Sequence, residues 1–196
     1  AEQVLTGIYT AYMSSGLYSG YLTLCPDIQA DLVYAVQGNS NQYGTLWLWD
    51  IRSTNSEVEA VYASLYKVIG RCNFYLDQVQ ELRDSMTDDG DIQMLDYFTG
   101  EVYCARALAY SELIKCFCKA YDPATAKDEL GVVLADTYFG AKPEKRASLY
   151  DSYQFVINDL EKAEQMLDEE NDYFDAPYFT QAAAHAIHAR VALYMQ

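Results

Sequence analysis

Apolar side chains recur at helical spacing over residues 3–13, and this pattern predicts a short first helix. From Tyr18 to Asp50 no helical period continues and turn-forming residues are frequent, so we predict a long irregular segment. Within it, the alternating run 45–49 has the pattern of a short strand with one tryptophan buried. The segment 124–147 is predicted to be a second loop, with a brief apolar run at 131–134.

The remaining apolar positions form two pairs of longer helical patterns. In the first pair, one helix begins after Ser56, which is its predicted cap, and its partner follows a turn at 87–91 and ends at Asp122-Pro123. The second pair covers 153–167 and 180–196. We therefore predict a mainly all-α fold of tetratricopeptide-like helical hairpins, with a long irregular loop and room for a short β segment.

The charge balance excludes one class of partner. The chain has 196 residues, and its 13 Lys and Arg against 29 Asp and Glu give a net charge of −16. Binding to nucleic acid needs a basic surface that neutralises phosphates, so we expect no nucleic-acid partner. The hydrophobic content of 51% is ample for a packed core. The 19 tyrosines suit partly hydrated surfaces, because each has an apolar ring and a polar hydroxyl.

The sequence carries little catalytic or metal-binding signal. It contains no nucleophile elbow, no phosphate-binding glycine loop and no dinucleotide fingerprint. His185 and His188 share one helical face, but no acid accompanies them in a zinc-protease motif, and the acidic run 88–91 lacks the spacing of a calcium loop. We predict that the protein is not an enzyme and has no metal and no cofactor.

Four segments, in order, resemble the helices of one known family. They are Val61 to Leu76, with its Leu65-Tyr66 pair and Asn73; Gly100 to Tyr110, which resembles a G-E-x-x-x-x-R-A-x-x-Y helix; Ile157 to Ala163; and Thr180 to Tyr194, with its Ala182-Ala183 pair and Ala189-Arg190. By these segments the chain resembles the SusD/RagB family of outer-membrane glycan-binding lipoproteins.

That resemblance implies a role. Members are non-catalytic surface lipoproteins that take part in nutrient uptake, capturing a glycan or oligosaccharide and passing it to a TonB-dependent porin of the SusC type. Residues 1–196 would then form a single helical domain, the N-terminal portion of a longer protein, with the helices as scaffold and porin contact. The expected localisation is the cell surface at the outer membrane, although no lipid-bearing cysteine begins this chain.

The irregular segment after Asp31 is the predicted ligand loop under this resemblance. Sugar binding requires a flat ring beneath the C–H face of the sugar, and amides or carboxylates that bond its hydroxyls. Within sixteen residues the segment supplies both, in Tyr34, Gln37, Asn39, Asn41, Gln42, Tyr43, Trp47 and Trp49. Two structural alternatives remain open: one tryptophan is buried in a strand, or the asparagine-rich tip is an ordinary turn.

Charged residues also lie on helices with apolar surroundings. Glu101 and Arg106 fall within the Gly100 to Tyr110 segment, and Arg190 lies in the last helix. Buried charges persist when they are matched, so we predict structural ion pairing between helices for these three residues, not ligand binding.

Two other functions remain as alternatives. A tetratricopeptide-like adaptor would bind a protein or peptide in a helical groove and would have no affinity for carbohydrate. An acidic helical hydrolase is the weaker alternative, because choosing two catalytic carboxylates in so acidic a chain would be arbitrary.

Overall fold

The structure is a computed structural model that describes residues 1–34, 36–38, 40–139 and 145–196. The described part is mainly helical, as predicted, with one short sheet. Its elements in chain order are α1 (Glu2–Tyr12), α2 (Tyr21–Gln29), α3 (Gly44–Trp47), α4 (Ser56–Ser85), α5 (Asp89–Phe117), β1 (Leu130–Val133), β2 (Arg146–Ser148), α6 (Leu149–Met166), the 3-10 turn η1 (Glu169–Asn171) and α7 (Gln181–Tyr194).

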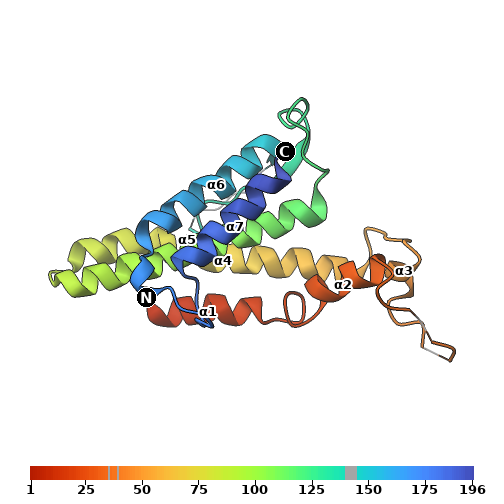
Figure 1. Ribbon diagram of the computed structural model, residues 1–196, viewed down its shortest axis with the longest axis horizontal. Helices are drawn as coiled ribbons and strands as arrows, with labels where there is room; N and C mark the ends of the chain where they lie inside the picture. Colours follow the sequence, from red (N-terminus) through yellow and green to blue (C-terminus); the bar gives the residue numbers. More distant parts are fainter. Residues whose placement is uncertain (35, 39, 140–144) are drawn as a thin grey trace.

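Two helical hairpins dominate the architecture. Helices α4 and α5 run antiparallel over their whole length, and α6 and α7 form a second hairpin that lies against α5 (Figure 1). Helix α1 packs along α4, while α2 and α3 extend beyond it at the opposite end of the molecule from the α4–α5 turn (Figure 1). Buried aliphatic and aromatic side chains of α1, α4, α5 and α6 form one hydrophobic cluster between these helices.

Two helix ends differ from the prediction. The cap of α4 is Asn55, whose side-chain oxygen accepts from the backbone N–H of Val58 at 3.0 Å, and not Ser56, whose hydroxyl donates to a neighbouring carboxylate. Helix α5 ends at Phe117, earlier than expected. The reason is that Asp122 starts a separate turn, in which its carboxylate accepts from the N–H of Ala124 at 2.9 Å.

The segment between Tyr18 and Asp50 is more helical than predicted. Helix α2 forms there despite the internal Pro26, because Leu22 and Ile28 are buried. The strand expected over 45–49 is wrong. These residues instead form the single turn α3 and its continuation, so the alternating apolar pattern does not mark a strand.

The β segment lies elsewhere, in the apolar run that was predicted to be a loop. Strand β1 pairs antiparallel with β2, and the backbone N–H of Val132 donates to the hydroxyl of Ser152 at 3.0 Å. A side chain at Gly131 would lie 2.0 Å from that hydroxyl oxygen, so only glycine permits this close approach of β1 to α6.

A buried guanidinium joins three helices. Arg106 of α5 donates two hydrogen bonds, of 2.7 and 2.8 Å, to the carboxylate of Asp159 on α6. Its third bond, of 2.8 Å, goes to the side-chain oxygen of Asn73 on α4. The guanidinium also lies over the Phe155 ring, 5.0 Å from its centroid. The charged groups of Arg106 and Asp159 are almost fully excluded from water. The two residues come from different segments of the family resemblance.

No helix in the described ranges is long and apolar enough to span a bilayer. Long helices such as α4 instead have one buried face and one polar face, which is typical of helices in a packed array.

We expect Asp159→Asn to destabilise the protein by about 3–5 kcal/mol, because it leaves the buried guanidinium of Arg106 without its counter-charge. The matched control is Asp96→Asn, which removes the same charge from the solvent-exposed pair with Arg83 and should cost at most about 1 kcal/mol. Urea unfolding followed by circular dichroism measures both values. Equal losses in the two variants would contradict a special role for the buried pair.

Candidate functional site

The predicted ligand segment is built around the single turn of α3. Tyr43 precedes this turn in the left-handed conformation, with φ of 61°, and its ring makes an edge contact with Tyr21 of α2. Leu46 is 1% exposed and anchors the turn to the protein. The side-chain amide of Asn55 donates to the Thr45 hydroxyl at 3.1 Å, which ties the turn to the start of α4. One buried leucine, one ring contact and one side-chain hydrogen bond therefore position an otherwise exposed segment.

The large aromatic side chains of this segment lie on the surface. Tyr34 is 81% exposed, Trp47 44% and Trp49 65%. The alternative in which one tryptophan is buried is therefore wrong: the turn directs Leu46 inward and leaves both indoles outside. Exposed rings of this kind are available to stack on a ligand.

Two of the predicted polar residues meet in one hollow. Asn41 and Tyr43 line a surface cavity of about 340 Å³, together with Asp50, Arg52 and Asn55. The guanidinium of Arg52 and the carboxylate of Asp50 form an exposed ion pair at 2.8 Å. The hollow thus offers an aromatic ring, amides and a charge pair within reach of one ligand.

The other predicted residues do not line this hollow. Gln37 and Gln42 are exposed, and Tyr34, Trp47 and Trp49 lie on the surface outside it. Asn39 lies outside the described residues. Asp50 and Arg52 were not among the predicted site residues, although opposite charges two positions apart beside an aromatic run are a signal for them.

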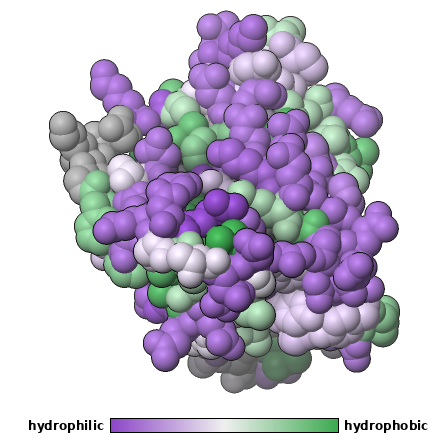
Figure 2. Space-filling view, turned by 90° about the vertical axis from the view of Figure 1, so that its left-hand side faces the viewer, coloured by the Kyte–Doolittle hydropathy of each residue, from purple (hydrophilic) through white to green (hydrophobic). Residues whose placement is uncertain are grey.

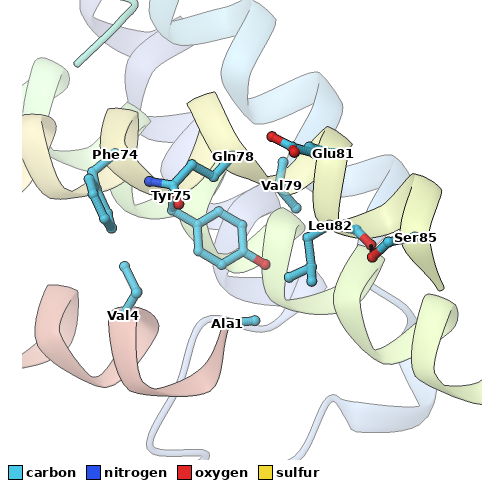
Figure 3. Close-up of a pocket in the computed structure, with 9 residues that line it drawn as sticks. All are labelled: Ala1, Val4, Phe74, Tyr75, Gln78, Val79, Glu81, Leu82 and Ser85. Carbon is cyan, nitrogen blue, oxygen red and sulfur yellow. Dashed lines mark hydrogen bonds between the residues drawn. The ribbon is translucent and has the colours of Figure 1, made fainter. Parts of the chain in front are cut away.

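Other cavities have different chemistry. One of about 980 Å³ lies between α2, the start of α4, the end of α5 and the β strands, with a mostly apolar lining that includes Pro26, Ile51 and Phe117. A smaller one of about 430 Å³ lies between α1 and α4, where Val4 faces Phe74 (Figure 3). Seen from the end that carries the α4–α5 turn, the surface is mostly hydrophilic, with apolar residues in smaller patches (Figure 2).

The charged helical residues take up three different arrangements. Arg106 binds Asp159, as described above, and Arg190 of α7 pairs with the buried carboxylate of Glu112 on α5 at 3.0 Å. The structure places Glu101 in another interaction: its Oε2 accepts a hydrogen bond from the Tyr9 hydroxyl of α1, and no ion pair to it occurs among the described residues.

The histidine pair also has a neighbour from another helix. The Nδ1 atoms of His185 and His188 lie 3.2 and 2.8 Å from Oε1 of Glu164 on α6. Across residues 1–34, 36–38, 40–139 and 145–196, no group of three or more His, Cys, Asp and Glu side chains has the arrangement of a metal site. The contact explains these imidazoles as part of the packing between α6 and α7.

A match to a known protein family shows where the chain belongs. A family described as starch-binding and associating with the outer membrane matches residues 2–193. The chain belongs to this SusD-like family. The resemblance predicted from four sequence segments is therefore confirmed. A search of curated protein sequences gave no significant match.

Solved structures of SusD-like proteins share the fold. A SusD superfamily protein from Bacteroides fragilis is 25% identical, with a TM-score of 0.80 over 99% of this chain. One from Bacteroides vulgatus is 21% identical with a TM-score of 0.80, and a SusD-like carbohydrate binding protein from the same organism is 20% identical with a TM-score of 0.77, each over 99% of this chain. The chain spans 45%, 42% and 40% of these three structures, respectively.

Glu101 makes stability depend on pH. Burial raises the pKa of this carboxyl from 4.5 to about 7, although the Tyr9 hydrogen bond opposes the shift. Between these pH values the folded protein binds more protons than the unfolded chain, so the free energy of unfolding falls as pH rises.

We expect Glu101→Gln to remove this dependence, because the amide stays neutral and still accepts from Tyr9. The variant should gain up to about 3 kcal/mol over the wild type between pH 5 and pH 8. Urea unfolding at both pH values measures the gain, with the exposed Glu59→Gln as the charge-matched control. A gain that is the same at pH 5 and pH 8 would show that Glu101 does not titrate in this window.

Proposed function

We propose that the protein captures a glycan through the segment 31–50, without catalysing a reaction on it. The observation that carries this proposal is the exposure of Trp47 and Trp49 on a turn held by one buried leucine. Indole rings that face solvent can stack on the C–H face of a sugar, and Asn41 with the Asp50–Arg52 pair can bond its hydroxyls. Membership of a family described as starch-binding supports the same ligand class.

The proposal extends to the site of action. The protein would act at the outer-membrane surface as a lipoprotein and pass its oligosaccharide to a TonB-dependent porin of the SusC type. The family's description as associating with the outer membrane supports this location. The helices would serve as a rigid scaffold, since the buried pair of Arg106 with Asp159 ties α5 to α6.

Replacing both tryptophans tests the ligand site. We expect Trp47→Ala combined with Trp49→Ala to weaken binding of maltoheptaose, or of the best oligosaccharide from a glycan array, at least about tenfold, since each stacked ring contributes about 1 kcal/mol or more. Isothermal titration calorimetry on the full-length protein measures the change. The melting temperature should stay within about 2 °C, because both rings are exposed.

Leu48→Ala is the matched control, because Leu48 lies between the two tryptophans and is 63% exposed. It should leave oligosaccharide binding unchanged. If the double tryptophan variant binds like the wild type, the segment 31–50 is not the glycan platform. If no glycan binds and a protein partner is retained by the double variant, the adaptor function is favoured instead.

A further inference from the structure

A further cavity, separate from those described above, lies at the other end of α1 from the segment 31–50. It has a volume of about 610 Å³ and is formed by α1, the first turns of α5, η1 and the segment that leads to α7. That segment passes beside α1 (Figure 1), where Tyr9 stacks on Phe179 with ring centroids 5.5 Å apart. The rings that line the cavity are Tyr9, Tyr97, Phe98 and Tyr178.

The lining is acidic as well as aromatic. Four carboxyl groups face the cavity, and no Lys, Arg or His is among the residues that line it. An anionic ligand would be repelled here, and a neutral one would leave the acidic groups without a counter-charge. A cation gains from both features, because aromatic faces and carboxylates each attract positive charge. The four acidic residues are Glu2, Glu101, Asp168 and Glu170.

Among the described residues, one buried hydroxyl of the cavity lacks a hydrogen-bond partner, and one buried carboxyl has a partner at one oxygen only. The Tyr97 hydroxyl is buried and has no hydrogen-bond partner among the described residues. Glu101 is 3% exposed, and the Tyr9 hydroxyl occupies Oε2 but leaves Oε1 without a protein donor in the part of the chain that the structure describes. Buried polar groups are normally satisfied, so a ligand that donates hydrogen bonds would complete the Tyr97 hydroxyl and add a second bond to the Glu101 carboxyl.

We propose that this cavity binds a small organic ligand that carries a primary ammonium group on a flat body. The ammonium has three donors and no acceptor, which suits the Tyr97 oxygen and the carboxylate of Glu101. The flat body would lie against Phe98 or Tyr178. Such a ligand is either an amine that carries an aryl ring or an amino sugar. The site is separate from the glycan segment 31–50, and its failure would leave the proposed function standing.

Matched probes separate charge from shape. Tyramine and tyrosol share one skeleton and differ by an ammonium in place of a hydroxyl, and glucosamine and glucose form the corresponding sugar pair. We expect tyramine, glucosamine or both to bind at millimolar or lower concentration, about tenfold more tightly than the neutral counterpart. Calorimetric titration of the protein measures all four ligands. The preferred cation tells whether the source is an aryl amine or an amino sugar.

Variants assign the binding to this cavity. Tyr97→Phe keeps the ring and removes the hydroxyl, and Glu101→Gln keeps the shape and removes the charge; each should weaken the cation about fivefold or more. The matched controls, Tyr121→Phe and Glu59→Gln, lie outside the cavity and should leave binding unchanged. The proposal is overturned if the neutral probes bind as tightly as the cations, if none of the four binds, or if the controls weaken binding equally.

Discussion

The guanidinium of Arg106 lies where α4, α5 and α6 meet, and moving such a charge out of water costs several kcal/mol unless every donor is matched. Asp159 and Asn73 supply the matching acceptors from the two flanking helices. The three helices must therefore meet in one register, since sliding either neighbour would separate these groups. The register of α5 on α6 also brings Gly100 against Met166 and Leu167, where a side chain would lie within 3.0 Å of both. The remaining helices pack onto this three-helix unit.

The surface is organised differently from this interior. Within the hairpins, charged groups that leave water are paired or hydrogen-bonded, and the apolar side chains of the core are buried. The segment 31–50 does the reverse, because it exposes Trp47 and Trp49 while a single buried leucine holds it in place. Exposed rings on a firmly held turn lose little conformational freedom when a ligand stacks on them, which favours binding. Scaffold and binding surface can therefore vary separately in sequence.

Much of the scaffold could be predicted, because the long helices have a clear amphipathic pattern in the sequence. The position of Arg106 on an apolar helix face also predicts that it has a buried partner. The identity of that partner, Asp159, depends on helix packing and has no local signal. Helix α2 was missed because no helical period continues between Tyr18 and Asp50 and turn-forming residues are frequent there. The conformation of the ligand segment could not be predicted either: Tyr43 and Trp49 adopt positive φ, a region that their residue types rarely enter. An alternating pattern of five residues fits a strand and a turn equally well.

In the proposed function, a glycan binds the exposed segment 31–50 while the helices around Arg106, α4, α5 and α6, stay unchanged. Hydrogen–deuterium exchange of the full-length protein, with and without a saturating oligosaccharide, tests it most directly. We expect slower exchange confined to the amides of residues 41–50 and unchanged, slow exchange in α4, α5 and α6. Protection that appears on the helical faces, with none in 41–50, would contradict it.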